Sequence, residues 1–111
     1  MSTYSLKELV SARSLPGSAS ALYTVPALTE AIVKQILVAN TTSTDLEATL
    51  YFVPSGDTPD TSNAMFPGVL ISANNTLSIE IKSVLPTGSS IHGFASASAS
   101  LNIHISGVEV A

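Results

Sequence analysis

Strict alternation of apolar and polar side chains is the feature of this sequence that most limits its fold. The alternation runs through residues 77–82 and 101–106, and it recurs over residues 48–52. A period of two places every second side chain on one face of a β-strand, so each segment is typical of a strand with one buried face. The apolar positions predict a core that includes Leu50, Phe52, Ile79, Ile81, Ile103 and Ile105.

The remaining strand candidates are shorter or less regular. Residues 32–39 are apolar on both faces near their end, which suits a central strand or a strand at a subunit contact. Turn-forming residues separate these runs, and no long helical pattern follows Ser20. This organisation predicts an all-β fold, either an antiparallel β-sandwich or a jelly roll. The shorter candidates are residues 22–25, 69–71 and 91–95.

Two segments are expected to be loops. Residues 57–68 have no periodicity and are rich in Asp, Thr, Pro, Ser and Asn, which is typical of an exposed loop. Residues 95–100 alternate Ala with Ser. We expect this run to join the last two strands, although side chains this small would also let another backbone approach closely.

The first twenty residues differ from the rest of the chain. Ser5 and Glu8 have the spacing of a capping box, which marks the beginning of a helix. We therefore expect a short helix from about Leu6, ending at the turn signal in residues 14–18. The apolar face of this helix would consist of Leu6, Leu9 and Val10, with Tyr4 packing on Leu9. The alternative is a frayed terminus.

The domain organisation follows from this difference. The chain has 111 residues, enough for one compact core. We expect residues 1–20 to be an N-terminal arm with the short helix and residues 21–111 to be the β-sandwich. Two turns of helix are marginal alone in water, so the apolar face of the arm must dock on the same subunit, on a neighbour or on another protein.

Charged residues are scarce in this chain. They make up 11% of it, against about a quarter in ordinary soluble domains, and hydrophobic residues make up 45%. The surface must therefore consist of Ser, Thr, Asn and Gly, and we expect partners to cover much of it. The formal charge of −4 and the scattered basic residues argue against nucleic-acid binding.

Membrane insertion and secretion are not expected either. No run approaches the roughly 20 apolar residues of a membrane helix, and residues 1–8 lack the basic-then-apolar order of a secretory signal. We therefore expect a soluble protein made in a cytoplasm. Without cysteine there is no disulfide framework, so stability must come from packing or assembly.

The sequence offers few residues for chemistry. His92 and His104 fall on strands that could be neighbours, but as a metal pair they have no third ligand at an obvious spacing. Asp57, Asp60 and Asn63 could supply oxygen atoms to calcium, but their spacing matches no tight calcium motif. We expect no catalytic residue, no metal and no cofactor, and hence a protein that is not an enzyme.

Aromatic residues on polar strand faces are the more informative signal. Tyr23 and Tyr51 are expected to point outward, where aromatic side chains often anchor interfaces. Alternatively, neighbouring loops cover them. Together with the arm they give the predicted assembly interface: Tyr4, Leu6, Leu9, Val10, Tyr23 and Tyr51.

Five segments follow one another in a distinctive order along the chain: residues 22–26, 31–42, 48–56, 71–77 and 101–110. This order resembles a small β-sandwich module in structural proteins of tailed bacteriophages. The resemblance covers residues 21–110, about four fifths of the chain, and rests on a pattern without an invariant chemical motif.

The resemblance implies a virion component, made in the cytoplasm of a host bacterium. The leading hypothesis is a capsid decoration protein that binds the major capsid protein through its N-terminal arm and an edge of the sandwich. The alternatives are a neck, head-fibre or tail accessory subunit that contacts other virion proteins and, in a different class, a carbohydrate-binding module. We also expect a homo-oligomer, with a trimer favoured because trimers are common among such proteins.

Overall fold

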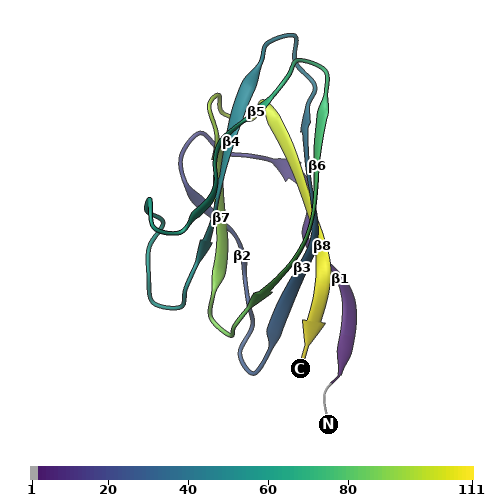
Figure 1. The fold of residues 1–111 in the computed structure, drawn as a ribbon, viewed down its shortest axis with the longest axis vertical. Helices are drawn as coiled ribbons and strands as arrows, with labels where there is room; N and C mark the ends of the chain where they lie inside the picture. The colour runs from purple at the N-terminus through teal and green to yellow at the C-terminus, as the bar shows by residue number, and fades with distance from the viewer. Residues whose placement is uncertain (1–2) are drawn as a thin grey trace.

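Two antiparallel sheets of four strands each form a β-sandwich (Figure 1). The computed structural model describes residues 3–111, which extend over 49 × 26 × 18 Å. Sheet A has the order β1-β8-β3-β6 and sheet B the order β2-β7-β4-β5. The strands are β1 (Tyr4–Ser14), β2 (Ser20–Thr24), β3 (Glu30–Asn40), β4 (Leu46–Val53), β5 (Ala64–Ile71), β6 (Thr76–Leu85), β7 (Ser90–Ala95) and β8 (Leu101–Val110).

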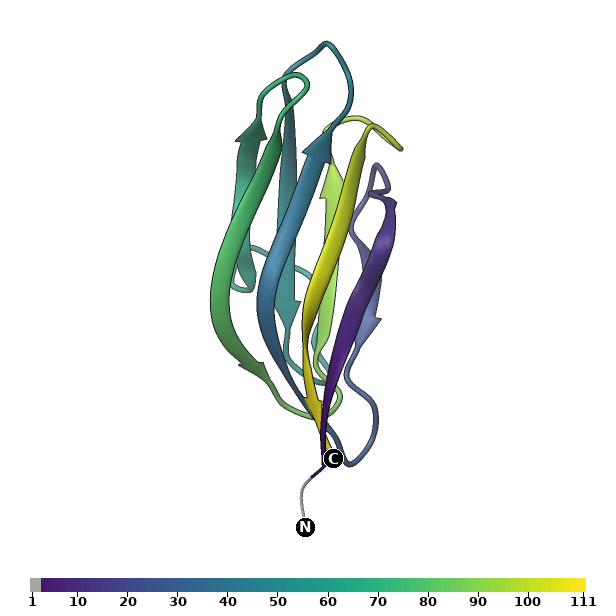
Figure 2. The ribbon, with the colours of Figure 1, turned by 90° about the vertical axis from the view of Figure 1, so that its right-hand side faces the viewer.

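The strand pairing is that of a jelly roll. β1 pairs with β8, β2 with β7, β3 with β6 and β4 with β5, so the first half of the chain lies antiparallel to the second half. The pairs β3–β8 and β4–β7 then join these ribbons into two sheets, and only the β4–β5 connection stays within one sheet (Figure 2). The predicted all-β sandwich is thus confirmed, and each of the seven strands expected after Ser20 is present.

The core lies between the two sheets. Leu50, Ile103 and Ile105 are at most 1% exposed, as their alternation predicts. The other three predicted core residues are only partly buried and pack against the same cluster: Phe52, Ile79 and Ile81. Two of these three lie on β6, an edge strand of sheet A, where the second sheet covers less of the inner face.

The helix predicted from Leu6 is wrong. Residues 4–14 form β1, and the described residues 3–111 contain no helix, hence none that could cross a membrane. The register of β1 with β8 shifts between Glu8 and Val10, so one extra residue bulges out of the pairing. As a result both Leu9 and Val10 are buried. An isolated helix of two turns would be marginal, whereas β8 supplies β1 with backbone partners along most of its length.

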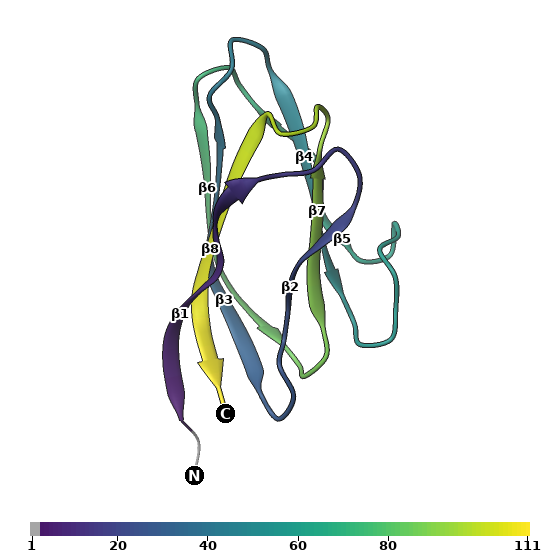
Figure 3. The ribbon, with the colours of Figure 1, turned by 180° about the vertical axis from the view of Figure 1, so that it is seen from behind.

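The division of the chain at residue 20 stays a prediction. Within the described residues, its first part contributes β1 to sheet A and the fully buried Leu15 to the core. Figure 3 shows β1 running along β8 before the chain crosses to β2 in the other sheet.

Register shifts cross sheet A at one level. β1 shifts after Glu8, and β3 shifts between Val33 and Gln35 toward both of its neighbours. Gly107 lies in the same region of β8, and a Cβ atom added there would lie 2.1 Å from the backbone oxygen of Ile32. The strands of the sheet curve along their length (Figure 2), as such bulges dictate.

One of the two predicted loops is confirmed, and the other is a loop only in part. Residues 96–100 join β7 to β8, as expected for the Ser/Ala run. The segment 57–68 is a loop only in its first part, because β5 begins at Ala64. Pro67 and Gly68 lie inside that strand, and Gly68 has a φ of +52°. Both residue types are typical of an edge strand and obscure a strand pattern in the sequence.

Candidate functional site

Titratable side chains do not gather into a chemical site in the described part of the chain. Residues 3–111 hold no group of three His, Asp or Glu side chains that could bind a metal ion. His92 lies on β7 in sheet B and His104 on β8 in sheet A, so the two strands are not neighbours. The Nδ1 atom of His92 lies 3.2 Å from the hydroxyl of Ser90, and burial lowers the pKa of this imidazole.

The acidic loop before β5 uses its polar side chains to shape its own backbone. The Asp60 carboxylate accepts hydrogen bonds from the hydroxyl and the backbone N–H of Ser62, and these bonds lower the pKa of Asp60. The side-chain amide of buried Asn63 donates to the carbonyl of Thr58 at 3.0 Å, and its oxygen accepts from the N–H of Asp60 at 3.1 Å. Two of the three residues that suggested a calcium ligand set, Asp60 and Asn63, are thus occupied in turn formation, and the third, Asp57, is exposed.

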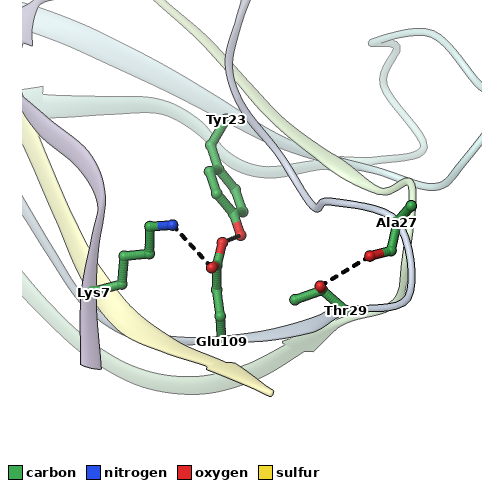
Figure 4. A network of polar contacts seen from close by, with 5 residues as sticks. All are labelled: Lys7, Tyr23, Ala27, Thr29 and Glu109. Carbon is green, nitrogen blue, oxygen red and sulfur yellow. Dashed lines mark hydrogen bonds and ion pairs between the residues drawn. The ribbon is translucent and has the colours of Figure 1, made fainter. Parts of the chain in front are cut away.

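A polar network closes one open edge of the sandwich (Figure 4). Glu109 on β8 accepts a hydrogen bond from the hydroxyl of Tyr23 at 2.5 Å and an ion-paired bond from Lys7 Nζ at 3.0 Å. Lys7 lies on β1, and Tyr23 lies on β2 in the other sheet. The ion pair is the one such pair among residues 3–111 and joins β1 to β8 within sheet A. The hydrogen bond from Tyr23 extends the network to β2 in sheet B.

The same network shifts two pKa values. Burial raises the pKa of Tyr23, and the hydrogen bond to Glu109 adds to that effect. The hydrogen bond from Tyr23 lowers the pKa of Glu109, and Lys7 contributes in the same direction. Tyr23 therefore stays a donor and Glu109 an acceptor at neutral pH. The arrangement is a clamp between sheets and offers no free proton-transfer group.

Tyr23 does not point outward, contrary to the sequence prediction. The register of β2 with β7 shifts between Ala21 and Tyr23, so Tyr23 lies opposite the fully buried Ile91. The extra residue, Leu22, turns the following side chain to the inner side of the sheet. The tyrosine is half-buried, with its hydroxyl on Glu109.

Tyr51 does lie on the outer face of sheet B. Its ring stacks on Phe94 with 6.2 Å between the ring centroids, and His92 lies opposite Tyr51 in the β4–β7 register. Both aromatic rings are half-buried. Each covers part of the other, so the outer aromatic surface of this sheet is small.

The four N-terminal residues of the predicted interface fall into two pairs. Leu9 and Val10 are 6% and 2% exposed and belong to the core of their own subunit. Tyr4 and Leu6 are 71% and 90% exposed. Only the second pair is free to contact another molecule.

An apolar row crosses the outer face of sheet A from edge to edge. Leu6 lies opposite Val108, Val108 opposite Ile32, and Ile32 opposite Val84, so each strand contributes one residue. Leu6 and Val84, at the two edges, are 90% and 60% exposed, while the two central residues are half-buried. We call these four residues the apolar row.

A second apolar feature lies where the chain termini meet. Tyr4 pairs with Val110 and Val110 with Glu30, so the β2–β3 turn lies at the same end as the termini (Figure 1). Leu28 in that turn is 91% exposed and has a φ of +57°. We call this surface, with Tyr4 and Leu28, the terminal end.

Comparison with known proteins finds a similar fold in solved structures of infectious bursal disease virus. No protein-family model matches the chain, and no curated protein matches it by sequence. Two solved structures of infectious bursal disease virus, the Gx strain and the Gt strain, match 98% of this chain with TM-scores of 0.55 and 0.50 and with 14% and 9% identity. A coat protein of Tobacco streak virus matches 99% of the chain and 85% of its own length at 11% identity, with a TM-score of 0.47.

These structural matches are evidence for the fold only. The chain spans 31% of the length of the matching infectious bursal disease virus chains, and at 14% identity the likeness supports the β-sandwich. The resemblance to tailed-bacteriophage proteins stays a prediction.

Sequence reasoning missed Leu28, Val84 and Glu109. Val84 and Glu109 lie just beyond the segments predicted as strands, which ended at residues 82 and 106 instead of at Leu85 and Val110. A signal for Val84 exists in the sequence: it continues the alternation of β6 at a position where the other residues are polar. Val84 thus adds exposed apolar surface to an outer strand face that is otherwise polar.

Proposed function

We propose that this protein is a structural subunit of a virus particle. The observation that carries the proposal is the apolar row, which leaves Leu6 and Val84 exposed at the two edges of one sheet in a chain with 11% charged residues. A surface of this kind suits repeated contacts with other subunits. The jelly roll is a common architecture of viral capsid domains, and a chain of infectious bursal disease virus has a similar fold.

Within that role we propose a capsid decoration protein of a tailed bacteriophage, made in the host bacterial cytoplasm. The segments that resemble phage β-sandwich modules support this choice. The protein would bind the major capsid protein through its N-terminal segment and an edge of the sandwich. The terminal end suits this contact, because it exposes Tyr4 and Leu28 beside the N-terminal segment. A neck, head-fibre or tail accessory position is the alternative.

The copy number in purified particles tests the proposal. Quantitative mass spectrometry should find the protein in the particle at a copy number comparable to that of the major capsid protein. A low copy number would assign it to the neck or tail. Particles that lack the protein altogether would overturn the virion role.

Variants of the terminal end test the place of attachment. The double substitution Tyr4→Ser and Leu28→Ser removes two exposed apolar side chains without touching the core. We expect the variant to fold and to be lost from particles. Leu70→Ser is the matched control, because Leu70 is 57% exposed on β5, an edge strand of the other sheet. Normal incorporation of the double variant would place the contact elsewhere.

A further inference from the structure

We propose that copies of this protein assemble edge to edge, with β6 of one copy pairing antiparallel to β1 of the next copy and Val84 lying opposite Leu6. This inference rests on the proposed function, because it identifies the neighbour that a subunit of an assembly would contact. The partner is a second copy of the same chain, and the contact is head to tail, because its two sides are different strands.

The geometry of sheet A favours this pairing. Its order β1-β8-β3-β6 leaves β1 and β6 as the two edges, and every neighbouring pair in it is antiparallel. β1 and β6 therefore run in opposite directions. A copy placed beside the first in the same orientation brings its β1 antiparallel to β6, so the sheet continues from one subunit to the next.

The phase of the backbone hydrogen bonds fits as well. Thr3 and Ala111 exchange both of their backbone hydrogen bonds, at 2.6 and 2.9 Å. In an antiparallel pair the hydrogen-bonded positions alternate, so the N–H and C=O groups of Leu6 point away from β8, toward the free edge. The same alternation carried across β8 and β3 directs the N–H and C=O groups of Val84 toward the opposite free edge. Val84 and Leu6 of two adjacent copies can thus exchange two hydrogen bonds.

The side chains agree with that register. Val84 and Leu6 both lie on the outer face, and they are the two most exposed residues of the apolar row. Pairing them joins the rows of neighbouring copies into one continuous apolar band. Two residues further along, Lys82 lies opposite Glu8 of the next copy, both exposed and of opposite charge. Opposite charges in directly facing positions stabilise a strand pair.

The other edges are less suited to pairing. β2 has only five residues, and β5 contains Pro67 and has two register shifts with β4. On β1, bulges after Glu8 interrupt the regular pairing, so only residues 4–8 offer an undisturbed edge. These are devices by which natural sheets block edge-to-edge contacts. The register of β6 with β3 also shifts once, between Ser83 and Glu80, but exposed and less exposed side chains alternate on β6 through that shift. The open edge of β1 lies at the level of the apolar row, where the proposed contact forms.

Proline substitutions test the contact without breaking the subunit. Leu6→Pro and Val84→Pro each remove an N–H that points to a free edge, so each variant keeps the hydrogen bonds within its own sheet. We expect the wild-type protein to form an oligomer by native mass spectrometry and both variants to be folded monomers. An equimolar mixture should form a dimer of one copy of each, because each variant retains the edge that the other lacks. The dimer would show that the contact is head to tail.

A charge exchange tests the register independently of proline. Glu8→Lys or Lys82→Glu alone places like charges opposite each other and should raise the dissociation constant of the oligomer by about threefold to tenfold, and the double variant should restore it. A wild-type monomer, a Leu6→Pro oligomer identical to the wild type, or a failure of the double variant to restore assembly would each overturn the proposal. A monomeric protein that still incorporates into particles would overturn this contact while leaving the virion role intact.

Discussion

Glu109 holds a hydrogen bond and an ion pair in one side chain. Its carboxylate is held by Tyr23 from sheet B and by Lys7 from β1, and its side chain is 11% exposed. The hydrogen bond from Tyr23 links the two sheets at this edge of the sandwich, and the ion pair with Lys7 links β8 to β1 within sheet A. The Lys7 side chain is 50% exposed, so salt should screen its attraction to Glu109 and should affect the hydrogen bond from Tyr23 less.

Replacement of Glu109 by Gln should make the protein less sensitive to acid. The pKa of Glu109 is lower in the folded state than in the unfolded chain, where it is about 4.3. The stability that the carboxylate contributes is thus fully present above about pH 5 and is lost as the pH falls through the folded pKa. Thermal unfolding midpoints between pH 7 and pH 3 should therefore fall less steeply in Glu109→Gln, from a lower starting value.

Glu30→Gln is the control for this effect, because it removes an exposed carboxylate at the start of β3. It should leave the steepness of the acid transition close to that of the wild type. Equal slopes for all three proteins would contradict the role given to the Tyr23–Glu109–Lys7 network.

Gly107 should tolerate no side chain. A Cβ atom there meets the backbone oxygen of Ile32, which cannot move without breaking the β3–β8 pairing. Gly107→Ala should lower the free energy of unfolding by about 3 kcal/mol or more, measured by urea denaturation. Gly56→Ala is the matched variant: nothing lies within 4 Å of its added Cβ, and the cost of its positive φ should be about 1–2 kcal/mol. Similar losses in the two variants would argue against the close approach at Gly107.

The alternation of apolar and polar side chains in the sequence identified individual strands well and bulges poorly. The seven strands after Ser20 follow from period-two patterns and turn residues, because each such pattern needs only local information. In β1, by contrast, the bulge buries Leu9 and Val10 side by side. Together with Leu6 this gives the spacing of a helical face, so the pattern predicted a helix. Which strand pairs with which, and the clamp at Glu109, depend on residues far apart in the chain and could not be predicted from local patterns.

The assignment of inner and outer strand faces can be tested on a central strand and on an edge strand of sheet A. Ile103 on the central strand β8 is 1% exposed, while Ile79 on the edge strand β6 is only partly buried. Ile103→Ala should cost about 2–5 kcal/mol in urea denaturation, and Ile79→Ala should cost less. A near-neutral result at Ile103 would mean that the faces of β8 are reversed.

The whole molecule is one long antiparallel ribbon that is rolled into two sheets. Its two ends meet, since Thr3 and Ala111 exchange backbone hydrogen bonds. The ends of β1 and β8 are thus placed like the two arms of a hairpin that lacks its loop. This closeness is a property of the topology, and no local feature of either terminus predicts it.

A circular permutant should therefore fold. Joining Ala111 to Thr3 through a linker of about four residues supplies the missing hairpin loop, and new termini between Asp57 and Thr58 fall in an exposed loop. We expect a two-state unfolding transition close to that of the wild type. The control opens the chain between Ile36 and Leu37, inside the central strand β3, and should not fold. If the permutant with new termini between Asp57 and Thr58 did not fold, that result would contradict the proximity of the termini.

The pairing of β1 with β8 also determines when the protein can fold in the cell. Lys7 and Glu109 are 102 positions apart, so β1 is synthesised long before its partner β8. Until β8 emerges from the exit tunnel, both β1 and β3 lack a neighbour in sheet A. The nascent chain therefore keeps an open sheet edge until that point. Sheet A can close only once β8 is available, so the emergence of this strand is the step that completes the sandwich.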